Sequence, residues 1–155
     1  MDFKKLANQY RDELLDNVLP FWLEHSQDIE FGGYFSCLDR EGKVFDTDKF
    51  IWLQGREVWM FSMLYNRVEK RQEWLDCAIQ GGEFLKKYGH DGNYNWYFSL
   101  DRAGHPLVEP YNIFSYTFAT MAFGQLSLAT GNQEYADIAK KTFDIVLSKV
   151  DNPKG

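Results

Sequence analysis

The sequence of 155 residues has few cysteines, few histidines and no cluster of basic residues, and each scarcity excludes a class of protein. Its 17 basic residues against 23 acidic ones give a net charge of -6, which leaves no basic surface for a phosphate backbone and argues against nucleic-acid binding. No run approaches the roughly 20 apolar residues that cross a bilayer. Cys37 and Cys77 lack the spacing of a metal site, so we expect two reduced thiols.

Aromatic residues are abundant instead, with 5 Trp, 9 Tyr and 13 Phe. A chain with so much large apolar material is folded, and we expect a core rich in aromatic rings. The N-terminal residues become amphipathic at once and contain neither the apolar stretch nor the cleavage site of a secretory signal. A cytoplasmic location is therefore expected.

Apolar residues at spacings of three and four predict five helices. The predicted ranges are 3–20, 48–68, 72–88, 111–129 and 134–150. The fourth contains no Lys, Arg, Asp or Glu and the second has few polar residues, so we expect both to be buried, whereas the other three have a face in water. Pro20 is expected to end the first helix, and Asp48 to be the N-cap of the second.

Two short aromatic segments around turn glycines are copies of one another. Tyr-Phe-Ser followed by Leu-Asp-Arg-x-Gly occurs within residues 34–42 and again at 97–104, and each copy predicts a β-hairpin. A repeat of hairpin, buried helix and amphipathic helix predicts an all-α fold, an (α/α) toroid in which inner helices line a centre and outer helices cover them. Two repeats and a leading helix do not close such a ring, so we expect the chain to be part of a longer protein.

Arg56 is the residue whose surroundings point most clearly to chemistry. At helical spacing it shares a face with Trp52 and Trp59. A permanently charged fork between aromatic walls near a helix N-terminus suits the binding of an oxyanion or of sugar oxygens. The alternative is a structural arginine that pairs with Glu57 or another acid at the rim of an outer face, beside a Gly55 that allows close helix packing. Spacing alone leaves both interpretations open.

Residues 52–60, Trp-Leu-Gln-Gly-Arg-Glu-Val-Trp-Met, follow Gly-Gly-Tyr-Phe at 32–35 and Leu-Asp-Arg-Glu-Gly at 38–42. Together they resemble the N-terminal part of the N-acylglucosamine 2-epimerase (renin-binding protein) family. Phe-Ser-Leu-Asp-Arg-Ala-Gly at 98–104 and Ile-Phe-Ser at 113–115 match the same family. Its members are (α/α)6 barrels more than twice this long, so the resemblance implies that residues 1–155 are the N-terminal part of one such domain.

The resemblance implies epimerisation, or in relatives aldose–ketose isomerisation, at C2 of an open-chain sugar, with N-acyl-D-glucosamine as the expected type of substrate. The C2 proton is acidic because the C1 aldehyde can take the charge as an enediolate. In the family one histidine removes the proton, another returns it on the opposite face, and an arginine at the position of Arg56 holds the oxyanion. His25, His90 and His105 match no catalytic histidine of the family, which places those histidines beyond residue 155. No cofactor or metal is implied.

Further residues near the starts of the predicted inner helices are candidates for binding the sugar, with core packing as the alternative for each: Trp52, Tyr111, Phe114, Ser115 and Tyr116. Tyr116 stands where eukaryotic relatives usually carry an acid, which leaves the identity of the sugar open. A homodimer of the full-length protein is an additional expectation. The alternative function is a non-catalytic helical-repeat module that binds a protein or a carbohydrate. A glycosidase is less favoured, because no pair of carboxylates stands out on the inner helices.

Overall fold

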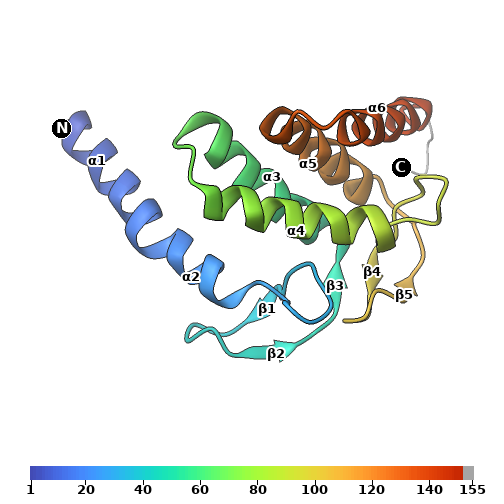
Figure 1. Ribbon diagram of the computed structural model, residues 1–155, viewed down its shortest axis with the longest axis horizontal. Helices are drawn as coiled ribbons and strands as arrows, with labels where there is room; N and C mark the ends of the chain where they lie inside the picture. Colours follow the sequence, from blue (N-terminus) through green and yellow to red (C-terminus); the bar gives the residue numbers. More distant parts are fainter. Residues whose placement is uncertain (152–155) are drawn as a thin grey trace.

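Four long helices in two layers form the body of the protein in a computed structural model that describes residues 1–151 (Figure 1). The inner helices α3 and α5 pack against each other, while α4 covers α3 and α6 covers α5. The bounds are Ile51–Arg67 for α3, Gln72–Tyr88 for α4, Phe114–Thr130 for α5 and Gln133–Ser148 for α6. The predicted helices and their alternation of buried and half-exposed partners are confirmed, with boundaries that differ by up to three residues. None of these described helices is long and apolar enough to span a membrane.

The leading helix does not end near Pro20, as predicted, but continues to His25. It consists of α1 (Phe3–Glu13), a π-helical turn η1 (Leu14–Val18) and α2 (Leu19–His25). Pro20 has no N–H to donate, and the wider π turn places it in the first turn of α2, where a missing donor costs little. Within this turn the amide of Leu19 donates to the carbonyl of Leu14. A proline therefore widens this helix without stopping it.

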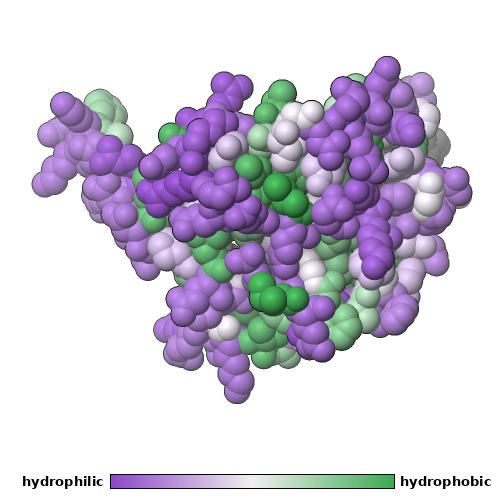
Figure 2. All heavy atoms as spheres, viewed as in Figure 1, coloured by the Kyte–Doolittle hydropathy of each residue, from purple (hydrophilic) through white to green (hydrophobic). Residues whose placement is uncertain are grey.

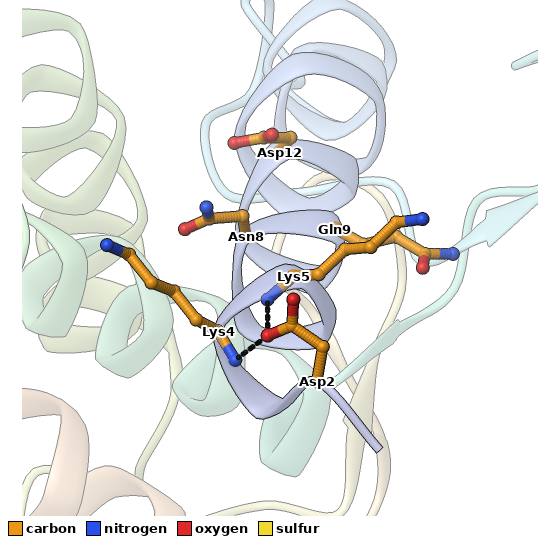
Figure 3. Close-up of a pocket in the computed structure, with 6 residues that line it drawn as sticks. All are labelled: Asp2, Lys4, Lys5, Asn8, Gln9 and Asp12. Atoms are coloured by element: carbon orange, nitrogen blue, oxygen red, sulfur yellow. Dashed lines mark hydrogen bonds between the residues drawn. The ribbon is translucent and has the colours of Figure 1, made fainter.

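Helix α1 projects from the body and contains no buried residue (Figure 1). Asp2 caps its N-terminus, because its carboxylate accepts hydrogen bonds from the amides of Lys4 and Lys5 at 3.1 Å each (Figure 3). The apolar residues that define its predicted stripe are all exposed: Phe3, Leu6, Tyr10, Leu14 and Val18. Hydrophobic atoms are visible at the free end of this helix in Figure 2.

The close approach of the inner helices depends on a small residue in α3. A Cβ atom added to Gly55 would lie 3.0 Å from the backbone carbonyl carbon of Phe118 in α5. Gly55 therefore has the packing role that the structural interpretation of this segment gave it. The apolar core that surrounds this crossing includes Val58 and Phe61 of α3 and Phe123 of α5.

Two β-hairpins confirm the internal repeat. Strand β1 (Cys37–Leu38) pairs with β2 (Val44–Asp46), and β4 (Ser99–Leu100) pairs with β5 (Pro106–Val108). In each turn the glycine has a positive φ, +84° for Gly42 and +98° for Gly104, and donates its amide to the carbonyl of the aspartate three residues before it. The register shifts at the same position of both hairpins. The copies in the sequence are thus copies in structure.

The prediction that Asp48 caps α3 is wrong. Strand β3 (Lys49–Phe50) pairs with β4, so the chain stays extended through Phe50 and α3 begins only at Ile51. The N-cap position falls on Phe50, which makes no side-chain capping bond. A pairing with a strand fifty residues later thus overrides the local capping signal. Cys37 and Cys77 are both free, as predicted.

Candidate functional site

Arg56 lies in the second turn of α3, where its exposed side chain faces a pocket between α2, α3 and the segment that precedes β1. The pocket has a volume of about 270 Å³. Its lining combines apolar, aromatic and polar side chains: Trp22, Ser36, Leu53, Arg56, Glu57 and Met60. A cleft of mainly apolar walls with a few converging polar groups is the usual form of a small-molecule site.

The guanidinium of Arg56 has no ion-pair or hydrogen-bond partner within residues 1–151. The structural alternative, a pair with Glu57, is therefore wrong for the described part of the chain. Helical geometry accounts for this, because adjacent residues on a helix point in directions about 100° apart. The five N–H donors of Arg56 remain available to a ligand in the pocket.

Glu57 is the chemically unusual group of this pocket. Burial raises the pKa of its carboxyl to about 8, and the hydrogen bond it accepts from the Ser26 hydroxyl only partly opposes that rise. Glu57 is thus mostly protonated at neutral pH. The hydroxyl of Ser36 in the same lining is buried and has no partner among the described residues. Sequence reasoning missed Ser36 and Trp22, because only the fold brings them to Arg56.

A second pocket, of about 370 Å³, lies between the start of α3 and the start of α5. Its walls are almost entirely aromatic: Trp52, Phe98, Asn112, Phe114 and Phe118 line it. The structure thus brings together two of the predicted sugar-binding residues, Trp52 and Phe114. Tyr111 lies beside this pocket, with its ring 4.9 Å from that of Phe98.

Ser115 and Tyr116, also predicted to bind substrate, are buried and line neither of these pockets. The hydroxyl of Tyr116 lies 3.4 Å from Oδ1 of Asn95 and 3.5 Å from Nζ of Lys149. These contacts fix the ring inside the fold. A substrate-binding role for either residue therefore stays a prediction.

None of the three histidines lines either pocket. His25 packs against Phe21, His90 stacks on Tyr94, and His105 bonds to Asp101 in the second hairpin turn. No group of three or more His, Cys, Asp or Glu side chains in residues 1–151 is placed to hold a metal ion. A third hollow runs along α1 (Figure 3), but its polar side chains all belong to that one helix and its N-cap, so no other element contributes to it.

A buried ion-pair cluster joins the loops below the two pockets. Asp28 accepts hydrogen bonds from Nζ of Lys49 at 3.0 Å and from Nε and Nη2 of Arg102 at 2.9 and 3.0 Å. Burial alone would raise the pKa of Asp28, but the bonds from Arg102 and Lys49 outweigh it and leave the pKa below its ordinary value. The cluster connects the second hairpin to β3 and to the loop after α2. It therefore fixes the start of α3, which carries Trp52 and Arg56.

Comparisons with known proteins agree on one family. A sequence model of the family "N-acylglucosamine 2-epimerase (GlcNAc 2-epimerase)" matches residues 33–155. The chain is 43% identical to the N-acylglucosamine 2-epimerase of Mus musculus over 149 residues, 93% of this chain and 36% of that protein. It is 44% identical to the N-acylglucosamine 2-epimerase of Homo sapiens over 137 residues, 86% of this chain and 32% of that protein. The chain thus spans about a third of the length of these relatives.

The fold has the same relatives. The cellobiose 2-epimerase of Bacillus thermoamylovorans superimposes with a TM-score of 0.85 and 28% identity, over 97% of this chain and 39% of that one. That neighbour is an (α/α)6 barrel. The likeness confirms the predicted fold class, a helical toroid with two short β-hairpins.

Proposed function

The chain belongs to the N-acylglucosamine 2-epimerase family, and from that premise we propose that the protein containing it inverts or isomerises an aldose at C2. The observation that carries this proposal is that the guanidinium of Arg56, which has no partner among the described residues, lines a pocket of mainly apolar walls. The relatives described above are named epimerases, and nothing in either pocket favours a non-catalytic binding module over an enzyme.

Arg56 has the chemistry that such a reaction requires. Removal of the C2 proton moves charge onto the oxygen at C1 of the open-chain sugar, which becomes an enolate, or an enediolate where C2 carries a hydroxyl. A guanidinium placed against that oxygen stabilises the charge as it develops. Leu53, Met60 and Trp22 provide the apolar walls. We place the two proton carriers outside this chain, because His25, His90 and His105 line neither pocket.

The substrate that we propose is an N-acyl-D-glucosamine, converted to the corresponding N-acyl-D-mannosamine. Support comes from identity, which is 43% to the mouse N-acylglucosamine 2-epimerase against 28% to the cellobiose 2-epimerase structure. The aromatic pocket offers flat rings on which the C–H faces of a sugar can stack, with Trp52 and Phe114 as the principal surfaces. Tyr111 lies at its side. The roles of Ser115 and Tyr116, a cytoplasmic location and a homodimer stay predictions.

We further propose that residues 1–155 form the N-terminal part of one ring-shaped domain. Apolar side chains are exposed at both ends of the described chain, on α1 and on the α5–α6 pair. Phe3 is 74% exposed at one end, and Leu128 and Leu147 are 70% and 53% exposed at the other. Further helical hairpins that pack on these faces would remove the apolar surface from water and close the ring.

Substitution of Arg56 tests the proposed chemistry in the complete protein. Removing one preorganised donor to a developing oxyanion lowers kcat by about 10² to 10³, and we expect Arg56→Ala to do so in conversion of N-acetyl-D-glucosamine. Arg56→Lys should recover only part of the loss, because an ammonium lacks the planar fork. Arg40→Ala is the matched control, since Arg40 is an exposed arginine in the first hairpin. Equal activities of the Arg56 and Arg40 variants would contradict the proposal.

A further inference from the structure

The pocket of Arg56 contains two polar groups whose bonding is incomplete. The Ser36 hydroxyl is buried without a partner among the described residues, and the Glu57 carboxyl accepts a single hydrogen bond, from Ser26. A buried polar group that lacks a partner is unfavourable, because it has lost its hydrogen bonds to water without a replacement. Folds usually satisfy such groups, and those that remain unsatisfied in a pocket are the groups that a ligand can satisfy.

The surroundings of Glu57 keep its carboxyl neutral. From the loop before β1 it is faced by the Tyr34 phenol, from α4 by the Cys77 thiol, and from the end of α2 by Ser26. Burial raises the pKa of Tyr34 and of Cys77 well above their ordinary values, so neither contributes a charge near pH 7. The one cation in the pocket lining, Arg56, forms no ion pair with Glu57 among the described contacts. A neutral carboxyl can donate a hydrogen bond, which a carboxylate cannot.

We propose that Glu57 and Ser36 contact the substrate beside Arg56, with the Glu57 carboxyl as a second hydrogen-bond donor to the charged C1 oxygen of the enolate and the Ser36 hydroxyl as a partner for a neighbouring sugar hydroxyl. This inference rests on the proposed function, since it names further residues of the same site. A protonated acid and a guanidinium together stabilise a negative oxygen without a second fixed charge. The family motif at residues 52–60 does not by itself indicate this role, because the neutral state of the Glu57 carboxyl depends on its burial among Ser26, Tyr34 and Cys77.

The role has a consequence for the pH profile. Above pH 8 the carboxyl loses its proton, the donor disappears, and a negative charge stands beside the oxygen on which charge develops. The value of kcat/KM, which reports ionisations of the free enzyme, should therefore fall about tenfold per pH unit above pH 8. The neutral thiol and phenol nearby stay protonated across this range and add no second step.

Two variants of the complete protein test the inference, with N-acetyl-D-glucosamine as the probe. We expect Glu57→Gln, which keeps a neutral donor of similar shape, to lower kcat/KM only several-fold at pH 7 and to remove the fall above pH 8. We expect Ser36→Ala to lower kcat/KM about tenfold. Ser62→Ala is the control, because its hydroxyl is also buried without a described partner but lies outside the pocket lining.

The possible outcomes separate this inference from the proposed function. If the wild-type protein converts the sugar but the alkaline fall persists in Glu57→Gln, the role of Glu57 is wrong and the epimerase proposal stands. If Ser36→Ala and Ser62→Ala change kcat/KM equally, the role of Ser36 is wrong and the epimerase proposal again stands. If the wild-type protein converts no aldose, the proposed function itself fails. Urea unfolding of each variant distinguishes a loss of activity from a loss of folded protein.

Discussion

Replacement of Asp28 by Asn removes the central charge of the buried cluster and should destabilise the protein strongly. The side chains of Asp28 and Lys49 are both fully buried. In the variant, the Lys49 ammonium keeps only the carbonyls of Gly32 and Arg102, at 2.6 and 2.9 Å, as acceptors of full strength. Breaking a buried pair by removal of one partner costs about 3–5 kcal/mol, because the other charge stays buried and uncompensated.

A second ion pair of Arg102, the arginine that bonds to Asp28, provides a matched control. Arg102 also pairs with Glu30, at 3.1 Å, and the Glu30 side chain is 65% exposed. A surface pair of this kind contributes about 0–1 kcal/mol, so Glu30→Gln should change stability by no more than that. Urea unfolding of the complete protein measures both variants. Equal losses in Asp28→Asn and Glu30→Gln would refute the reasoning that burial decides the value of these contacts.

The cluster also predicts a pH dependence of stability. The pKa of Asp28 in the folded protein is lower than the ordinary value near 3.8. Ionised Asp28 therefore contributes to the free energy of unfolding above pH 3.8, and this contribution is lost as the pH falls through the folded-state pKa. Unfolding curves between pH 6 and pH 3 should show this loss in the wild type. Asp28→Asn has no such group at this position and should show a correspondingly smaller acid dependence. If Asp28→Asn loses stability with falling pH as steeply as the wild type, the acid sensitivity comes from other carboxylates and the reasoning about Asp28 is wrong.

Two further substitutions test the packing of the inner helices and the aromatic pocket. Gly55→Ala should lower the free energy of unfolding by about 1–3 kcal/mol, because the new Cβ meets the backbone of Phe118. Gly124→Ala should raise the free energy of unfolding by about 0.5–1 kcal/mol, because no atom lies within 4 Å of its new Cβ. A gain in both variants would contradict the close contact of α3 and α5. Trp52→Ala should raise KM about tenfold or more, because it removes a stacking surface of the aromatic pocket. Phe45→Ala, at an exposed residue of β2, is the control and should leave KM unchanged. Equal KM values of the two variants in steady-state kinetics would contradict a sugar site in this pocket.

The sequence predicts most of the fold because helical period and internal copies are local signals. The range 72–88 agrees with α4 at both ends, since its apolar stripe begins after a loop and ends at a glycine. The two hairpins follow from their shared turn sequence. Pro20 and Asp48 mislead for the opposite reason: a π turn absorbs the first, and pairing between β3 and β4 overrides the second.

Less of the candidate site can be predicted, because its chemistry depends on contacts distant in sequence. Arg56 could be singled out from the sequence, although Trp52 and Trp59, the aromatic walls predicted for it, do not line its pocket. The neutrality of Glu57 is not, since it results from burial against α2, α4 and the loop before β1. The repeated Leu-Asp-Arg also hides a difference: Arg40 is exposed, whereas Arg102 bonds to Asp28. Equal sequence motifs thus have unequal roles once the fold places them.

Exchange with solvent at C2 tests the central claim most directly. The complete protein is incubated with N-acetyl-D-glucosamine in D₂O, and the product is analysed by mass and by NMR. Removal of a proton by one group and its return by another on the opposite face predicts one solvent deuterium at C2 of the N-acetyl-D-mannosamine that forms. Product without deuterium would contradict a mechanism in which the C2 proton is removed and replaced by a proton from a group that exchanges with solvent. Absence of both product and exchange with every aldose tried would contradict the assignment of an epimerase.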